Sequence, residues 1–296
     1  MSASRTALVT GATGFVGRHL VPALLAEGWD VRALTRRPEA YDGPGTVVGG
    51  DVDDPTTLAP ALEGVDVAFY LVHALDHADF EQRDARAATA FARAAEQAGV
   101  RRIVYLGGLG ADGETLSRHL RSRREVEHLL AGTSVPVTAL RAAIIVGAGG
   151  ISWELTRQLV KNLPAMVVPR WASTRTQPIS LDDTVRYLVG VADHPDAEGR
   201  TFEIGGADSL TYQEMLQVTA EQVVGHRVPI VRVPVLTPRL SSYWLALVTD
   251  IDIQTGRNLI DSLGTEVVVT DWSIRDVVPG DPLPYTEAVR RALAQR

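Results

Sequence analysis

The sequence predicts an α/β fold, a doubly wound parallel sheet with a smaller C-terminal cap region. Three observations lead to this class. Short apolar runs alternate with longer helical patterns in the first half of the chain, and a glycine-rich turn follows the first of these runs. Residues 65–72 are apolar at nearly every position, as in a strand whose two faces are both covered. Strands that alternate with helices form a parallel sheet.

The elements of the first half follow one another in a regular order. We expect strands at residues 7–10, 31–35, 47–48, 65–72, 102–106 and 135–141. We expect helices at residues 14–27, 55–62, 80–97 and 116–131. Gly28 and Gly99 stand where two of these helices should end.

Beyond Gly147 the alternation is less regular. We expect helices at residues 153–163, 180–192 and 211–223, and short extended segments at 167–169, 176–179 and 201–204. Ser180 is expected to cap its helix, with Asp183 three residues on. We therefore divide the chain into residues 1–147 and residues 148–296, the second part packing on the same sheet rather than forming an independent domain.

Composition excludes several classes of site. The 296 residues contain no cysteine, and Lys161 is the only lysine among 29 basic residues. Disulfides, cysteine nucleophiles and thiolate metal sites are therefore excluded, and a Schiff base would have to form at Lys161. A net charge of −7 argues against nucleic-acid binding. We expect no membrane span and no signal peptide, and hence a cytoplasmic protein.

The glycine-rich turn carries the most specific pattern in the chain. Glycines at 11, 14 and 17 lie between an expected strand and an expected helix, which is the context of a Rossmann dinucleotide-binding fingerprint. The helix N-terminus would then face the phosphates. The residues of this turn that we expect to contact the cofactor are Gly11, Thr13, Gly14, Phe15, Val16 and Gly17.

The end of the second expected strand indicates which nucleotide is bound. An acidic residue there would favour NAD, but this chain has Arg36 and Arg37 after Thr35. Guanidinium groups suit a 2′-phosphate, so the sequence favours NADP(H).

The glycine spacing resembles that of atypical and extended short-chain dehydrogenases/reductases, including the NmrA-like NAD(P)H-binding group. Further segments extend the resemblance over most of the chain: Gly50-Asp51-Val52, Tyr70 to His73, Leu140 to Gly147, Gln177 to Asp183, and Pro238 to Trp244. It implies an NADP-binding region at residues 1–147 and a substrate-binding or cap region at 148–296. The cofactor contacts that the resemblance implies are Asp51, Val52, Leu71, Val72, Ala142, Ala143 and Ile144.

The sequence departs from the family at the residues that transfer the proton. Active members use a serine after strand five and a Tyr-x-x-x-Lys pair on the next helix. Here Gly107-Gly108 occupies the serine positions, and His119 and Arg123 occupy the tyrosine and lysine positions. In one interpretation His119 is the acid and Arg123 clamps the ribose. In the other, His119 lies on the surface and Arg123 forms a plain ion pair with Glu127.

These features lead to two main functional hypotheses, beside a third, an assembly or structural subunit that retains nucleotide only for stability. The first is an NADPH-dependent reductase of a small, partly apolar carbonyl, imine or enone, with catalytic candidates His119, Arg123, His73 and Tyr70. The second is an NADP(H)-binding redox sensor without turnover. The expected partner is a small-molecule substrate, and a homo-oligomer is left open. We expect no metal, because His73, His77 and their neighbouring aspartates lack a metal-binding spacing.

Overall fold

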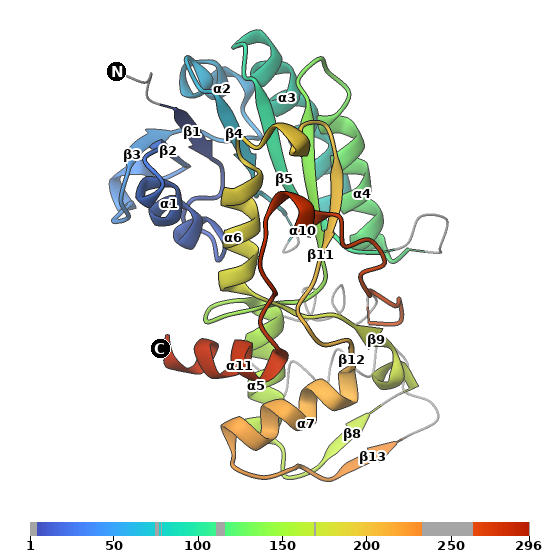
Figure 1. Ribbon diagram of the computed structural model, residues 1–296. Coiled ribbons are helices and arrows are strands. Elements are labelled where there is room, and N and C mark those ends of the chain that lie inside the picture. Colours follow the sequence, from blue (N-terminus) through green and yellow to red (C-terminus); the bar gives the residue numbers. More distant parts are fainter. Residues whose placement is uncertain are drawn as a thin grey trace.

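The computed structural model describes residues 5–74, 77, 79–110, 116–168, 170–232 and 263–295, and these form an α/β fold (Figure 1). Seven parallel strands of the described chain build one sheet in the order β11-β6-β5-β4-β1-β2-β3. Their bounds are β1 (Thr6–Val9), β2 (Asp30–Thr35), β3 (Thr46–Gly49), β4 (Val67–Tyr70), β5 (Arg102–Gly108), β6 (Val137–Ala142) and β11 (Thr201–Ile204). The order reverses between β1 and β4, which confirms the predicted doubly wound sheet.

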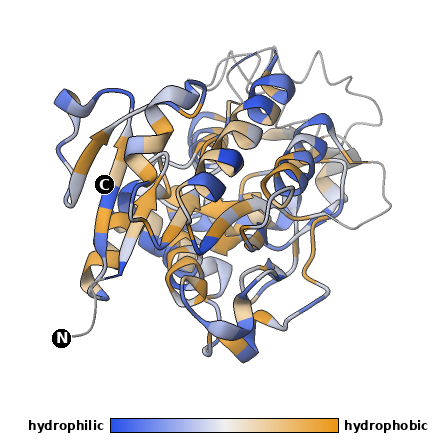
Figure 2. Cartoon of the chain, turned by 90° about the horizontal axis from the view of Figure 1, so that it is seen from above, coloured by the Kyte–Doolittle hydropathy of each residue, from blue (hydrophilic) through white to orange (hydrophobic). Residues whose placement is uncertain are grey.

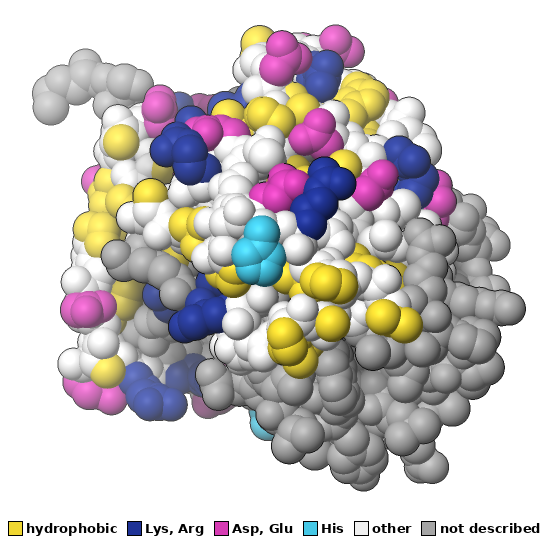
Figure 3. Space-filling model, turned by 90° about the horizontal axis from the view of Figure 1, so that it is seen from below, with side chains coloured by type: hydrophobic (Ala, Val, Ile, Leu, Met, Phe, Trp, Pro, Cys, Tyr) yellow, Lys and Arg dark blue, Asp and Glu magenta, His cyan; other side chains and the backbone are white. Residues whose placement is uncertain are grey.

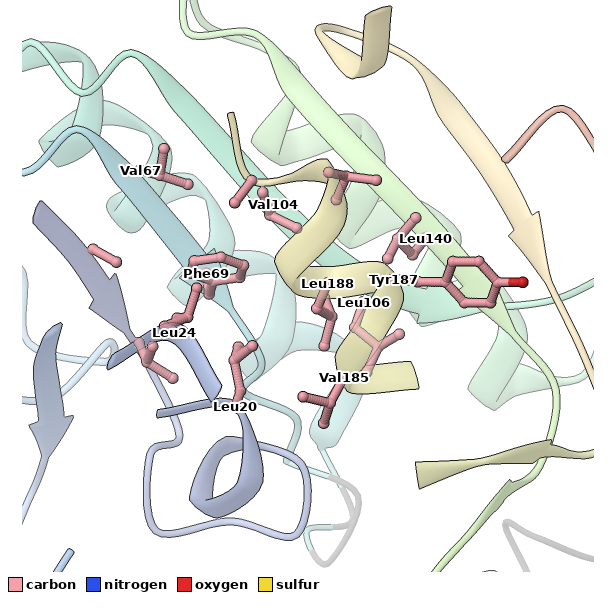
Figure 4. Packing of buried hydrophobic residues seen from close by; sticks show 14 of the residues in the cluster. Leu20, Leu24, Val67, Phe69, Val104, Leu106, Leu140, Val185, Tyr187 and Leu188 are labelled. Atoms are coloured by element: carbon pink, nitrogen blue, oxygen red, sulfur yellow. The ribbon is translucent and has the colours of Figure 1, made fainter. Parts of the chain in front are cut away.

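Helices cover both faces of this sheet. They are α1 (Gly17–Ala26) and α6 (Leu181–Val191) on one face, and α2 (Pro55–Leu62), α3 (Phe80–Gln97) and α4 (Arg118–Leu130) on the other. Figure 4 shows the first of the two cores, where Leu20 of α1 and Leu188 of α6 pack over Phe69 and Leu140 of the sheet. Both faces of the strands are therefore shielded from water, as their apolar composition indicates.

The end of β4 differs from the predicted strand and is held by a side chain. The sheet pairing stops at Tyr70, and residues 71–74 leave the sheet. The hydroxyl of Thr10 donates to the Phe69 carbonyl oxygen at 3.1 Å and accepts from the Leu71 N–H at 3.0 Å. Thr10 thus ties the end of β4 to the glycine-rich turn that follows β1.

Part of the second half belongs to the main sheet. The edge strand β11 pairs with β6, and α6 begins at the expected cap, where the Asp183 N–H donates to the Ser180 hydroxyl at 2.9 Å. The other helices of this half are α5 (Ile151–Asn162), α7 (Tyr212–Val223), α10 (Ile274–Val277) and α11 (Tyr285–Ala294). The short strands are β7 (Ile145–Val146), β8 (Met166–Val168), β9 (Arg175–Thr176), β10 (Ile179–Ser180), β12 (Leu210–Thr211) and β13 (Ile230–Arg232).

The helices α5, α7 and α11 lie together below the sheet (Figure 1). They enclose a small core of their own, in which Trp153 is 1% exposed and packs with Met215 and Val289. Seen from above, the strands of the sheet are largely hydrophobic and the helices carry residues of both kinds (Figure 2). The cap region therefore has an apolar interior that meets the carboxyl-terminal side of the sheet.

The described part of the lower face mixes acidic, basic and hydrophobic side chains (Figure 3). Within the described residues, no helix combines the length and the apolar composition that crossing a lipid bilayer requires.

Candidate active site

Two cavities lie where the strands of the sheet end. The first, which we call the glycine cleft, has a volume of about 490 Å³ and follows the ends of β1, β2, β3 and β4. Its lining includes Thr10, Gly11, Thr13, Gly14, Arg36, Arg37, Asp51, Val52, Leu71, Val72, His73 and Asp84. Nine of the predicted cofactor-binding residues and the catalytic candidate His73 therefore meet in one cleft. This is the edge at which open parallel sheets bind ligands.

Three glycines shape the turn that forms the floor of the glycine cleft. Gly11 has a positive φ of 62°, and its carbonyl oxygen accepts from the Gly14 N–H at 2.8 Å. A Cβ at Gly17 would collide with the Gly11 carbonyl and come 2.8 Å from the Ala12 Cα. The close backbone approach excludes a side chain at Gly17, and the positive φ disfavours one at Gly11.

The N-terminus of α1 opens into this floor. Val16, its N-cap residue, makes no side-chain cap hydrogen bond, and the first turn contains no acidic residue. The helix dipole and the first N–H groups are therefore not screened by a carboxylate of the helix itself, which suits a bound phosphate. The turn fits the pyrophosphate of a dinucleotide. Val16 and Gly17 do not line the cleft and act on this turn through packing.

The far end of the cleft contains the residues expected around the adenosine. Arg36 and Arg37 are exposed at the end of β2. Asp51 follows β3, where its N–H donates to the Thr57 hydroxyl at 2.9 Å and its carboxylate accepts from the Asp53 N–H at 3.0 Å. Two cations and a fixed turn with a carboxylate therefore face the same end of the cleft.

The second cavity, which we call the apolar pocket, lies between the sheet and the cap region. It has a volume of about 520 Å³. Its lining includes Phe15, Gly108, Leu109, His119, Ala142, Ala143, Ile144, Leu155, Thr156, Leu159, Tyr212, Met215 and Leu216. The predicted cofactor contacts Phe15, Ala142, Ala143 and Ile144 are thus found at the apolar pocket and not in the glycine cleft. Aliphatic side chains from α5 and α7 form part of its wall, as in pockets that take apolar ligands.

A hydrogen-bonded pair of histidines connects the two cavities. His73 lines the glycine cleft and His119 lines the apolar pocket. The His73 Nε2 lies 3.1 Å from the His119 Nδ1, and the His73 Nδ1 lies 2.6 Å from the Asp84 Oδ2. Of the two sequence interpretations of His119, one assigns it to the site and the other to the surface, and neither connects it to His73; the structure places it at the apolar pocket.

Asp84 is the residue of this cluster that sequence reasoning missed. It is 3% exposed, and its carboxylate also accepts from the Ala74 N–H at 2.9 Å and from the Ser122 hydroxyl at 3.3 Å. Burial raises the pKa of Asp84, but the hydrogen bond and charge of His73 and the Ala74 N–H outweigh burial and hold the pKa below its usual value. Asp84 therefore carries a negative charge at neutral pH.

Burial determines the charge of His119. It lowers the pKa of this side chain to about 3, and the positive charges of His73 and Arg123 act in the same direction. His119 is therefore neutral at neutral pH and does not store a proton as an imidazolium ion, contrary to what we expect of a simple acid.

Tyr70 is in the hydrophobic core and not at the cleft. It is 1% exposed, and its ring packs 5.0 Å from that of Phe91 and 6.3 Å from that of Tyr105. Burial raises the pKa of Tyr70 far above its ordinary value. The expectation that Tyr70 is catalytic is therefore corrected: the side chain packs on the face of β4 that α2 and α3 cover and lines neither cavity.

Arg123 lies beneath the cavities and contacts the backbone. Its guanidinium donates to the carbonyl oxygens of Leu106 and Val72, the latter at 3.4 Å, and lies 4.9 Å from the Tyr105 ring centroid. The alternative ion pair with Glu127 is wrong, because Glu127 binds Arg141 of β6 at 2.7 Å. Arg123 instead joins the ends of β4 and β5.

The glycines at the end of β5 are closely packed. A Cβ at Gly108 would lie 2.8 Å from a methyl group of Leu120, and a Cβ at Gly107 would lie 2.9 Å from the Tyr105 ring. A serine at either position would therefore require its neighbours to shift. Among the described residues no three potential ligands converge on a metal site.

Comparisons with known proteins identify the family. A model of an NAD(P)H-binding family matches residues 11–172. A ceramide reductase of Caulobacter vibrioides is 30% identical over 278 residues, which cover 90% of this chain and 84% of that protein. The chain belongs to this NAD(P)H-binding family. This confirms the predicted resemblance.

The chain is also similar to a second reductase and to a reductase of known structure. A (4-alkanoyl-5-oxo-2,5-dihydrofuran-3-yl)methyl phosphate reductase of Streptomyces griseus is 32% identical over 219 residues, covering 70% of each chain. Triphenylmethane reductase of Citrobacter sp., solved with NADP(H), has the same fold, with a TM-score of 0.78 and 21% identity over 97% of this chain and 99% of that one. The motif at residues 238–244 lies outside the described residues. Family membership makes this chain an NAD(P)H-binding protein.

Proposed function

We propose that this protein is an NADPH-dependent reductase that transfers hydride to a small, partly apolar carbonyl, imine or enone. The observation that carries the proposal is the junction of the glycine cleft and the apolar pocket at His73 and His119. A dinucleotide in the cleft and an apolar substrate in the pocket would approach each other at this junction.

The preference for NADPH rests on the cations at the far end of the cleft. Arg36 and Arg37 follow β2, where an acidic residue would hydrogen-bond the ribose of NAD. Two guanidinium groups suit the 2′-phosphate that distinguishes NADP(H). We assign Arg36 to the phosphate contact and Arg37 to assistance by stacking.

The side chains of the pocket would perform two tasks. Aliphatic residues such as Leu155 and Met215 exclude water from the reacting atoms. His119 donates a hydrogen bond to the substrate oxygen or nitrogen and passes a proton to it. The cofactor supplies the hydride when bound. This scheme operates without the serine, tyrosine and lysine of the wider superfamily.

The names of two relatives agree with this substrate class. One is a ceramide reductase and the other reduces an alkanoyl furanone phosphate. Both names combine reduction with a partly apolar substrate, which is the kind of molecule that the apolar pocket fits. The redox sensor differs from this proposal in one respect only: it binds NADPH and does not oxidise it.

The experiment measures NADPH oxidation by the purified protein with an aromatic aldehyde, a quinone, a cyclic enone and a cyclic imine. We expect oxidation above the protein-free rate with at least one of them. His119→Gln should then lower kcat by about 100-fold or more, the range of general acid–base catalysis. His128→Gln, an exposed histidine on the same helix, is the matched control and should keep the wild-type rate.

Tight NADPH binding without turnover of any of the four compounds would overturn the reductase and favour the sensor. Turnover that survives His119→Gln would instead overturn the role of His119 and leave the reductase in place.

A further inference from the structure

The Asp84 carboxylate and the two histidines form one continuous hydrogen-bonded chain. It runs from α3 through the end of β4 to α4, with contacts of 2.6 Å and 3.1 Å. The His73 side chain keeps 19% of its surface exposed, whereas the Asp84 side chain keeps 4%. Asp84, at one end of this hydrogen-bonded series, is therefore a buried carboxylate. His73, in the middle, is accessible from the glycine cleft, and His119, at the other end, lines the apolar pocket.

Hydrogen-bond chemistry fixes where the protons of this chain lie. The charged Asp84 carboxylate only accepts, so the His73 Nδ1 must donate to it. When His73 is neutral, its Nε2 is an acceptor, and the His119 Nδ1 donates to it. When His73 is protonated, its Nε2 donates to the His119 Nδ1, and the proton of His119 then resides on Nε2.

We propose that Asp84 and His73 are positioning residues that place a proton on the Nε2 of His119 and supply a proton to its Nδ1 as the Nε2 proton is transferred. This inference rests on the proposed reductase function and deepens it, because it names the proton source of the same site. A neutral His119 alone would present a lone pair to the substrate as readily as a proton. Protonated His73, held by Asp84, selects the form of His119 that donates.

The step balances in protons and charge. Hydride adds to the electrophilic carbon of the substrate, and the oxygen or nitrogen takes the proton from the Nε2 of His119. The Nδ1 of His119 takes the proton from the Nε2 of His73. His73 becomes neutral and the Asp84 carboxylate stays ionised. To restore the starting form, one proton from solvent adds to the Nε2 of His119, and the Nδ1 proton of His119 returns to the Nε2 of His73. NADPH, a proton and the substrate thus give NADP⁺ and the reduced product.

Several other charged groups around the pair are held in ion pairs or backbone contacts. The groups that surround it in the described chain are Glu81 and Arg83 of α3, Arg118 and Arg123 of α4, and His77 and Asp53 at the cleft. Glu81 binds Arg118 at 2.7 Å and Asp53 lies 3.4 Å from Arg83. Asp84 lies 2.6 Å from His73, and its negative charge stabilises the protonated form of His73.

The negative charge of Asp84 determines how kcat depends on pH. Protonated His73 is the active form, so kcat should fall as the pH rises through the titration of His73. Asp84→Asn removes the negative charge that favours the protonated form, so the fall should move to lower pH, by about one unit or more.

The direct test is an NMR titration of the full chain with ¹⁵N-labelled histidine, without cofactor or substrate. Signals of His73 and His119 are assigned by their loss in His73→Gln and His119→Gln. We expect His119 to stay neutral from about pH 5 to about pH 9 and to change from the Nε2–H to the Nδ1–H form at the same midpoint at which His73 loses its proton. Asp84→Asn should lower that midpoint, whereas Asp276→Asn, an exposed aspartate of α10, should not.

If Asp84→Asn folds poorly, His73→Gln and the values of kcat and KM provide a second test. In His73→Gln, the tautomer of His119 should no longer change with pH. With the most rapidly reduced compound of the panel, both variants should lower kcat by about tenfold or more and leave KM nearly unchanged.

The outcomes separate the two proposals. A His119 tautomer that does not follow His73, or an unchanged midpoint in Asp84→Asn, overturns the proton path whatever the turnover. If His119→Gln abolishes turnover but Asp84→Asn keeps the wild-type pH profile, the reductase stands and the path is wrong. Absence of turnover with every compound overturns the reductase itself and the catalytic use of the path.

Discussion

Side chains below the two cavities hold the strand ends in place. Arg123 is 8% exposed, and its guanidinium binds the carbonyl oxygens at the ends of β4 and β5. A planar guanidinium can serve two such acceptors at once, which a single ammonium group does less well. This geometry favours a supporting role for Arg123 over a direct hold on the ribose.

Arg123→Lys separates these two roles. We expect the variant to lose one backbone contact and to lower Tm by about 3–8 °C, while the Kd for NADPH changes little. Thermal unfolding followed by circular dichroism and NADPH binding by calorimetry provide the two values. A large loss of NADPH affinity at unchanged Tm would instead indicate that Arg123 contacts the ribose of the cofactor.

Arg36 determines the choice between NADPH and NADH in this account. Arg36→Ala should weaken NADPH binding by about tenfold or more, because a charge-assisted contact to the 2′-phosphate is lost, and should leave NADH binding nearly unchanged. Calorimetric titration of both nucleotides measures the difference. Arg93→Ala on the exposed side of α3 is the matched control. Equal affinity for the two nucleotides, unchanged by the substitution, would refute the phosphate contact.

At the scale of elements, the turn between β1 and α1 depends on backbone approach. Gly17→Ala should force the Gly11 carbonyl away, with a cost of about 1–3 kcal/mol and a loss of NADPH affinity. Gly264→Ala is the matched control, since its added Cβ would meet no atom within 4 Å. Tm and the Kd for NADPH measure both effects. A Gly17→Ala protein that binds NADPH like the wild type would contradict the assigned role of the turn.

The elements that could be predicted are those with a local signal. A few neighbouring residues suffice to predict the apolar strands β1 and β4, the glycine turn and the Ser180 cap. The structure confirms these elements. The position at which β4 ends was not predictable in this way. It depends on the hydroxyl of Thr10, which is 61 positions from Leu71 in the chain.

Asp84 shows what a closer examination of one helix would have found. Phe80, Ala87, Ala88 and Phe91 are buried along one face of α3, and Asp84 lies on that same face. A carboxylate within an apolar stripe needs a partner. The spacing therefore contained a signal for a buried acid, although only the fold shows that the partner is His73. The prediction that Tyr70 is catalytic was wrong for a related reason, because alternate residues of a strand point to opposite faces of the sheet.

At the scale of the whole molecule, the cap region supplies most of the apolar pocket. Thr156→Trp on α5 should fill part of the pocket and raise KM for the reduced compound by about tenfold or more, while the Kd for NADPH stays the same. Lys161→Trp, exposed on the same helix, is the control. Steady-state kinetics and NADPH titration measure the two constants. Unchanged KM in Thr156→Trp would indicate that the substrate binds elsewhere.

A crystal structure of the protein with NADP⁺ would show whether the glycine cleft binds the cofactor and the apolar pocket receives the substrate. We expect the 2′-phosphate at Arg36, the pyrophosphate over the turn at Gly14, and the nicotinamide C4 facing the apolar pocket beside the His119 ring. A nicotinamide ring turned away from the apolar pocket and out of reach of His119 would contradict it.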